Sequence, residues 1–336
     1  MKALRLESVG NLRLVDIDVP RPSPGEILVK TGAALICTSD INDLRRNVFG
    51  LCLPVVMGHE GAGAVAAVGR GVKGFKIGDR IAAHPVHPCW KCDNCREGRA
   101  HLCSNMSHFG INMQGTFAEY FLVRHDRARV IPKSVPFTTA ALAEPVCVCL
   151  ETLAQARLSR GDRLLIIGDG PFGIIISRLA ASLCLSKVVV AGHHDFRLSR
   201  IGPAVAVNTN KTPDPLAAIK SHAPSGYDAM ILAVGSAKAV ETGIECLKAK
   251  GRAVIFSAVP GLTPIDLFKV HVKELEIIGA CNDNDMLDRA VALLRNKRLR
   301  LDELVTHRLR LEDFQRAFAL AESSREEALK VAFVFD

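Results

Sequence analysis

The sequence predicts a doubly wound parallel α/β sheet joined to a β-rich domain, and three observations support this fold class. Leu164–Ile167 is a short apolar run, typical of a strand buried on both faces. The pattern Gly168-x-Gly170-x-x-Gly173 follows it directly, and an apolar helical stretch comes next. From residue 147 to 284 strand and helix patterns alternate, whereas the earlier residues are typical of short strands separated by turns.

The elements of the predicted sheet can be placed by their apolar runs and by the turns between them. Strands are expected at 164–167, 187–191, 229–234, 253–257 and 275–279. Helices are expected near 172–183, 238–248 and 265–272. This alternation is typical of strands that run parallel with helices on both faces.

The residues outside this region predict a second domain, which the chain enters twice. Glu26–Lys30 reads as a strand after a proline-rich break, and 115–123 reads as a strand pair. Residues 285–336 contain two amphipathic helical stretches and a terminal strand, Lys330–Phe335, with no evident core of their own. We therefore expect one domain from 1–146 with 285–336, and the parallel-sheet domain from 147–284.

Each glycine of the loop has a physical task in binding a dinucleotide. The first makes a tight turn, the second lets backbone approach a pyrophosphate, and the third lets helix and strand pack closely. The helix N-terminus then offers free N–H groups and the positive end of a dipole to phosphate oxygens. The candidate cofactor-binding residues of the loop are Gly168, Gly170, Pro171, Phe172 and Gly173.

Four cysteines form the sharpest local pattern, Cys89-x-x-Cys92-x-x-Cys95-x7-Cys103. Four thiolates at this spacing can close around one tetrahedral zinc ion. The intervening residues offer little apolar surface, so a metal would organise the lobe at about 84–106. Because all four positions would be filled by protein, the predicted zinc site is structural.

A second group of metal-ligating residue types is spread more widely in the sequence. Cys37 precedes a polar run, and His59-Glu60 lies between glycines. Cysteine, histidine and carboxylate would make an open catalytic zinc site if they converge. Glu144 is a further candidate ligand, with a helix N-terminal carboxylate as the alternative. The remaining cysteines are expected to pack as small apolar residues: 52, 147, 149, 184, 246 and 281.

Composition narrows the class of protein. The chain has 336 residues, 49% hydrophobic, and a formal charge of +8 without an aromatic and basic platform, so we expect no nucleic-acid partner. We expect no membrane span, because no apolar run approaches the roughly 20 residues that one needs. The first residues carry charges where a secretion signal would need an apolar core. Eleven cysteines then favour thiols and metal ligands over disulfides. A cytoplasmic protein is expected.

In the order of its motifs, the chain resembles the zinc-dependent medium-chain dehydrogenases, particularly the sorbitol, threonine and sugar-phosphate dehydrogenase branch. The motifs that carry this resemblance span nearly the whole sequence: Ile36-Cys-Thr-Ser-Asp40, Gly58-His-Glu60, Gly74–Arg80, the four-cysteine lobe, Gly115–Tyr120, Glu144-Pro145, Gly168–Gly173 and His271–Gly279. The resemblance implies a GroES-like β-barrel catalytic domain and a Rossmann dinucleotide-binding domain.

The resemblance also implies roles for individual residues. Cys37 and His59 match zinc ligands, Glu60 and Glu144 match the third ligand or the group that holds zinc-bound water, and Ser39 matches the hydroxyl that takes the substrate's proton. The family's relay histidine is replaced by Asn42, and an arginine–tyrosine pair of the polyol enzymes falls on Asn282-Asp283. Sorbitol itself is therefore not expected to be the substrate.

The implied function is zinc-dependent hydride transfer between a secondary alcohol of a polyol, sugar or sugar derivative and a nicotinamide cofactor. One alternative is a primary-alcohol or aldehyde reductase on the same scaffold. Another is a non-catalytic relative that binds NADPH. The expected partners are a small-molecule alcohol or ketone and other copies of the chain, as a homodimer or homotetramer joined at the edge strand 275–279.

The end of the second strand of the parallel sheet bears on the choice of cofactor. An acidic residue about 20 positions after the glycines binds the ribose 2′-hydroxyl and repels a 2′-phosphate. Here the strand ends at Gly192, followed by His193, His194 and Arg197. The sequence thus favours NADP(H), with NAD(H) possible if Asp195 reaches the ribose.

Overall fold

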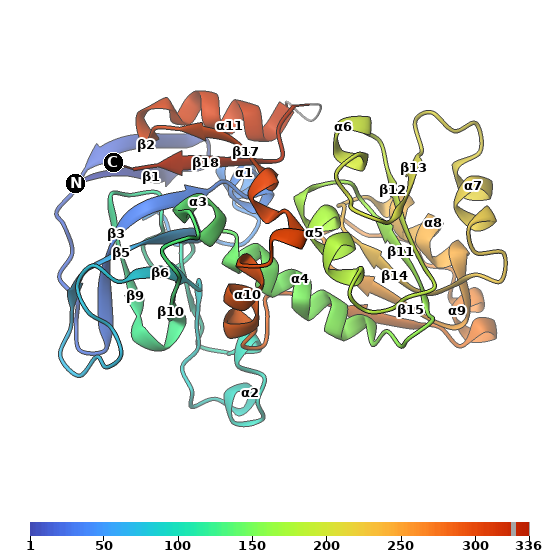
Figure 1. Ribbon diagram of the computed structural model, residues 1–336, viewed down its shortest axis with the longest axis horizontal. Helices are drawn as coiled ribbons and strands as arrows, with labels where there is room; N and C mark the ends of the chain where they lie inside the picture. Colours follow the sequence, from blue (N-terminus) through green and yellow to red (C-terminus); the bar gives the residue numbers. More distant parts are fainter. Residues whose placement is uncertain (324–326, 336) are drawn as a thin grey trace. The chain divides into compact units, whose positions relative to one another are not determined.

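The computed structural model describes residues 1–323 and 327–335 (Figure 1). Residues 324–326 and 336, which belong to the predicted first domain, lie outside the described residues. The chain divides into two compact units. The first consists of Met1–Cys147 and Asn284–Asp336, and the second of Val148–Asp283.

The second unit contains a six-stranded sheet in which every strand pair is parallel. The strand order, β13-β12-β11-β14-β15-β16, reverses direction beside β11, as in a doubly wound sheet. The strands are β11 (Arg163–Ile167), β12 (Lys187–Gly192), β13 (Val205–Asn208), β14 (Tyr227–Leu232), β15 (Leu247–Ile255) and β16 (Glu276–Gly279).

Helices connect these strands and cover the sheet (Figure 1). They are α5 (Pro171–Ala180), α6 (Asp195–Leu198), α7 (Pro215–Ser221), α8 (Ala237–Cys246) and α9 (Leu267–Lys273). Ile219 of α7 and Val240 and Ile244 of α8 pack in one buried cluster with Leu165 of β11 and Met230 of β14. Apolar strand residues that face helices in this way explain why these strands read as continuous hydrophobic runs.

Three elements of the second unit were missed at the sequence level, namely β13, α6 and α7. Val205–Asn208 is too short to stand out as an apolar run, and α6 has only four residues. The strand predicted at 253–257 spans Leu247–Ile255 in the structure. Its start was not predicted because Lys248–Arg252 contains three basic residues and a glycine and so lacks an apolar run. The other predicted strands and helices fall on observed elements within a few residues.

The first unit is built around a seven-stranded sheet in which β3 is central. The first half of β3 pairs with β9, its second half pairs with β18, and β5 lies along its other side. The returning segment therefore supplies two strands of this sheet, β17 and β18. The strands of the unit are β1 (Lys2–Ser8), β2 (Asn11–Asp16), β3 (Glu26–Leu35), β4 (Val55–Val56), β5 (Glu60–Val68), β6 (Arg80–Ala83), β7 (Val86–His87), β8 (Ser107–His108), β9 (Tyr120–Arg124), β10 (Ala128–Val130), β17 (Val305–Leu309) and β18 (Lys330–Val334).

The first unit contains more helices than its sequence, which predicted a β-rich domain, indicated. They are α1 (Thr38–Arg46), α2 (Asp93–Arg96), α3 (Phe137–Ala140), α10 (Leu287–Leu294) and α11 (Phe314–Ser323), with short 3₁₀ turns between some of them. A further helix, α4 (Ala143–Ala156), begins in this unit and continues past Cys147 into the second. The prediction missed α1, whose only signals are a capping carboxylate, Asp40, and one apolar face. The strand pair expected at 115–123 is one strand, β9.

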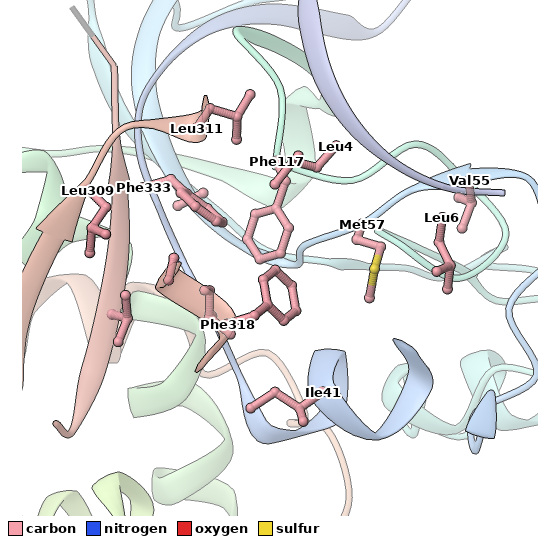
Figure 2. Packing of buried hydrophobic residues seen from close by; sticks show 14 of the residues in the cluster. Leu4, Leu6, Ile41, Val55, Met57, Phe117, Leu309, Leu311, Phe318 and Phe333 are labelled. Atoms are coloured by element: carbon pink, nitrogen blue, oxygen red, sulfur yellow. The ribbon is translucent and has the colours of Figure 1, made fainter. Parts of the chain in front are cut away.

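The core of the first unit joins residues from both of its segments (Figure 2). Phe117 makes edge contacts with the rings of Phe318 and Phe333, with ring centroids 6.2 and 5.1 Å apart. Leu4 and Met57 lie in the same cluster. Because α11 and β18 bring large aromatic rings into this core, these two elements of the returning segment are part of its packing.

One stretch, Phe137–Ala156, is long and apolar enough to cross a membrane by length and composition. The expectation that no run approaches this length was wrong, because α3 and α4 together contain only two charged residues, Glu144 and Glu151. Most of the stretch is buried inside the protein. Such burial is also typical of a core helix in a water-soluble protein.

Candidate active site and metal centres

Cys37, His59 and Glu60 converge in the first unit, as the catalytic-zinc prediction requires. Cys37 caps the N-terminus of α1, and His59 and Glu60 stand at the start of β5. Their ligand atoms all lie within 4.8 Å of one another. The pairing of Leu35 with Glu60 across β3 and β5 explains this convergence, since it places the residues that follow β3 beside the beginning of β5.

Asp40 orients the imidazole of this cluster and was not assigned a role from the sequence. Its carboxylate lies 3.2 Å from Nδ1 of His59 and also accepts a hydrogen bond from the backbone N–H of Cys37. Burial alone would lower the pKa of His59, but Asp40 and Cys37 outweigh it and raise that pKa well above its usual value. Carboxylates commonly orient metal-binding histidines in this way, leaving the other ring nitrogen for the metal.

The environment of Glu60 gives a direct test of whether these residues fit a metal. One oxygen of this fully buried carboxylate pairs with the buried ammonium of Lys330 in β18. The other oxygen, Oε2, has no hydrogen-bond partner among the described residues. An unpartnered buried carboxylate oxygen is costly, so the arrangement fits a cation held between Glu60, Cys37 and His59.

Lys330 was predicted only as part of a terminal strand, and nothing in its local sequence marks it as part of the site. Burial tends to lower the pKa of its ammonium, but the negative groups of Glu60, Cys37 and Glu144 raise it above the ordinary value. The lysine is therefore a fixed positive charge behind Glu60. Strand pairing, and not sequence proximity, brings it there.

Ser39 and His108 complete the polar lining near His59. The hydroxyl oxygen of Ser39 lies 3.4 Å from Nε2 of His59, next to the nitrogen expected to bind metal. The ring centroid of His108, a residue that the sequence reasoning did not single out, is 5.9 Å from that of His59. Burial, followed by the charge of His59, lowers the pKa of His108 to about 3, so this ring is neutral near pH 7.

Glu144 is not part of the set of converging ligand atoms. It lies in the first turn of α4, is buried, and is close enough to Lys330 to raise the pKa of that lysine. This position agrees with the alternative of a helix N-terminal carboxylate, which complements the helix dipole. Its role as a zinc ligand stays a prediction.

The four cysteines of the lobe also converge, and their ligand atoms lie within 4.8 Å of one another. The sulfur of Cys92 is 3.5 Å from that of Cys95 and 3.8 Å from that of Cys103. Four sulfurs at about 2.3 Å around one zinc ion would be separated by about 3.8 Å. Backbone N–H groups of Lys91 and Cys92 lower the pKa of Cys89 to about 6, whereas burial and the neighbouring Cys92 and Cys103 raise the pKa of Cys95 to about 12. The thiolate that binds metal is thus favoured at Cys89.

The prediction for the remaining cysteines was only partly right. Cys147, Cys149 and Cys246 are buried, as expected for small apolar residues. The other three are exposed: Cys52, Cys184 and Cys281. Exposed cysteines away from both metal centres provide matched controls for replacing a metal ligand.

Replacing Cys92 with serine is expected to remove one zinc ion per chain while the second site keeps its metal. A hydroxyl is a poor zinc ligand, and without metal the lobe has little regular structure to hold it: a four-residue helix, a 3₁₀ turn and the two-residue strand β7. Metal analysis and limited proteolysis within 84–106 would measure both effects. Cys184→Ser is the control, and an unchanged zinc content in Cys92→Ser would refute the structural site.

The glycine loop of the second unit has the geometry that its sequence predicts. A side chain at Gly168, which has φ of +124°, would meet the carbonyl oxygen of Ala233 at 2.6 Å. One at Gly173 would lie 2.0 Å from the carbonyl oxygen of Gly168. Gly170, by contrast, faces open space just before Pro171, the first residue of α5. A pyrophosphate could therefore approach the backbone at Gly170 and Phe172, so the loop fits a dinucleotide.

The end of β12 differs from expectation in one respect. The sequence places no acidic residue at Gly192, but the carboxylate of Asp169 fills the space where a side chain at Gly192 would be. His193 is exposed, His194 is half-buried against Asp169, and Arg197 lies in α6, which begins at Asp195. The sequence did not reveal that the side chain of Asp169, in the glycine loop, packs against the last residue of β12.

Comparison with known families agrees with both units. Residues 23–134 match the alcohol dehydrogenase GroES-like domain, and residues 171–296 match the family described as zinc-binding dehydrogenase. A relative from Pyrococcus abyssi, L-threonine 3-dehydrogenase, is 31% identical over 93% of this chain and 92% of its own length. The chain belongs to the zinc-binding dehydrogenases.

Solved structures of dehydrogenases share the fold over the full length. One from Sinorhizobium meliloti, bound to NADP, has a TM-score of 0.92 and 28% identity, and the match covers 99% of each chain. An alcohol dehydrogenase from Escherichia coli, complexed with NADH, has a TM-score of 0.93 and 26% identity, covering 100% of this chain and 99% of its own. The predicted fold class and family resemblance are thereby confirmed.

Proposed function

We propose that this zinc-binding dehydrogenase transfers hydride between a secondary alcohol of a polyol, sugar or sugar derivative and a nicotinamide cofactor. The observation that carries the proposal is the convergence of Cys37, His59 and the unpartnered oxygen of Glu60, with the Ser39 hydroxyl beside them. The relative from Pyrococcus abyssi is named for L-threonine, whose hydroxyl at carbon 3 is a secondary alcohol. That name supports this substrate class.

The residues of the site have separable tasks in such a reaction. Zinc bound there would polarise the substrate oxygen and lower the pKa of its hydroxyl. Ser39, 3.4 Å from Nε2 of His59, is placed to accept the hydroxyl proton. Asp40, at Nδ1 of His59, orients the imidazole so that Nε2 would be the nitrogen left to hold a metal. Asn42 in α1 cannot relay the proton by titrating, so the proton would leave Ser39 through water, another group of the protein or the cofactor ribose.

For the cofactor we propose NADP(H) as favoured, with NAD(H) also accepted. The strand β12 ends without an acidic side chain of its own, and His193, His194 and Arg197 follow it. Histidine and arginine side chains can donate hydrogen bonds to a phosphate. The Sinorhizobium meliloti structure bound to NADP supports this choice, and the Escherichia coli structure with NADH supports tolerance of both.

A substrate panel with metal analysis tests this proposal. The purified protein is assayed with L-threonine, polyols, sugar phosphates and primary alcohols, each with NAD⁺ and NADP⁺ at saturation. We expect reduced cofactor to form with at least one secondary alcohol in zinc-loaded protein. Turnover of primary alcohols or aldehydes alone would support the primary-alcohol reductase. Binding of NADPH without catalytic zinc or turnover would support the non-catalytic alternative.

We also propose that the protein is a cytoplasmic homodimer or homotetramer that pairs at the edge strand β16. An unpaired strand edge favours association with another copy. Large apolar side chains are exposed on this strand and on α9: Leu267, Phe268, Val272 and Ile277. Sedimentation at micromolar concentration should show a dimer or tetramer, and Ile277→Lys should shift it toward monomer. A monomeric wild-type protein would rule out the proposal.

A further inference from the structure

The space beneath Gly192 is occupied by a carboxylate from another part of the chain. A side chain on Gly192 would lie 2.5 Å from Cβ of Asp169 and 2.7 Å from its Oδ2. Asp169 is the residue between the first two glycines of the loop, whereas Gly192 is the last residue of β12. The chain thus supplies from β11's loop the acidic group that dinucleotide-binding sheets commonly supply from the end of the second strand.

The contacts of Asp169 leave one of its oxygens available. Oδ2 accepts hydrogen bonds from the backbone N–H groups of His193 and His194, both at 2.7 Å, and lies 3.0 Å from Nδ1 of the His194 ring. Oδ1 accepts no hydrogen bond from any residue that the structure describes. The side chain is about nine-tenths buried, with 9% of its surface exposed. Asp169 is therefore a fixed carboxylate with one acceptor still to be satisfied.

We propose that Asp169 is the residue through which this chain distinguishes a ribose 2′-hydroxyl from a 2′-phosphate on the adenosine half of its cofactor. The inference rests on the proposed function, because it assumes that the glycine loop binds a nicotinamide dinucleotide. A hydroxyl can donate to the free oxygen of Asp169, whereas a phosphate meets a like charge there. Asp169 thus opposes the preference for NADP(H) that His193, His194 and Arg197 favour.

Asp195 is the other carboxylate near this turn, and its surroundings argue against the same role. Its side chain is 59% exposed and forms an ion pair with Lys211. Asn208 donates a hydrogen bond to its other oxygen, and these two partners lower the pKa of Asp195. Both oxygens are already engaged with partners in and after β13. Asp195 is therefore a matched control for a change at Asp169.

The experiment compares the binding of two cofactor fragments by calorimetry, without any turnover. 5′-AMP carries the 2′-hydroxyl, and 2′,5′-ADP carries the 2′-phosphate. In Asp169→Asn an oxygen can still accept from the His193 and His194 N–H groups, but the charge is gone and an N–H₂ group replaces the free oxygen. We expect the affinity ratio of 2′,5′-ADP to 5′-AMP to rise about tenfold in this variant, and to change less than about twofold in Asp195→Asn.

Several outcomes would overturn the inference, and they can be told apart from failure of the proposed function. If Asp169→Asn weakens both fragments equally, the residue only supports the turn and the inference is wrong. If Asp195→Asn shifts the ratio instead, the ribose is recognised from α6. If the wild-type protein binds neither fragment, the dinucleotide function fails, and the inference with it. Should Asp169→Asn not fold, Asp169→Ser, which keeps an uncharged acceptor, carries the same expectation.

Discussion

Replacing Cys37 or His59 with alanine is expected to lower turnover by about 1,000-fold or more, because polarisation of the substrate oxygen by a metal is worth several kcal/mol. Each variant removes one of the three ligand atoms that converge within 4.8 Å. The affinity for 5′-AMP should be unchanged, since the glycine loop belongs to the other compact unit. Steady-state kinetics, metal analysis and calorimetry on the same samples would test both halves of this prediction.

The matched control for this experiment is Cys52→Ala. Cys52 is an exposed cysteine of the same unit that does not belong to either converging ligand set, so its replacement should leave zinc content and rate unchanged. Near-normal rates in Cys37→Ala or His59→Ala, with catalytic zinc absent, would show that the proposed metal-dependent mechanism is wrong.

Replacing Lys330 with methionine is expected to lower the free energy of unfolding of the metal-free protein by about 3–5 kcal/mol. The substitution keeps most of the side-chain volume but leaves the Glu60 carboxylate buried without its counterion. Zinc next to Glu60 would replace part of the lost positive charge, so the loss should be smaller in the zinc-loaded protein. Urea unfolding with and without a chelator measures both values.

Two further variants test whether the loss of stability comes from the unpaired buried charge of Glu60. Lys2 forms an ion pair with Glu312 on the surface, where 46% and 45% of the two side chains are exposed. Lys2→Met should therefore change stability far less than Lys330→Met, because solvent screens this exposed pair. Adding Glu60→Gln to Lys330→Met should recover part of the loss, because no unpaired buried charge remains. Equal effects of Lys2→Met and Lys330→Met would contradict the interpretation of the buried pair.

The features predictable from sequence were those encoded within a short stretch. The glycine loop and the four-cysteine lobe each need neighbours only a few residues away, so their spacing largely determines their geometry. Cys37 and His59 are further apart, yet each stands in a local motif, and the pairing of β3 with β5 brings them together. Residue type and motif order were sufficient to predict all three of these arrangements.

The features missed depend on contacts between distant or unmarked residues. Lys330 lies in an ordinary apolar strand, and only its position in the sheet places it behind Glu60. Asp169 occupies a variable position of the glycine pattern, and its filling of the space at Gly192 depends on the spacing of two neighbouring strands. Periodicity cannot report such contacts, because it describes each element separately.

The pairing of β3 with β18 has a consequence for how the protein is made. Glu60 and its counterion Lys330 are 270 residues apart, and the whole of the second unit, Val148–Asp283, is synthesised between them. At translation rates of about 5–20 residues per second, this interval lasts on the order of tens of seconds. The nascent parallel-sheet unit can therefore fold on the ribosome while the first sheet still lacks β17 and β18. During that time the Glu60 carboxylate lacks its counterion, and the second half of β3 lacks one of its two neighbouring strands.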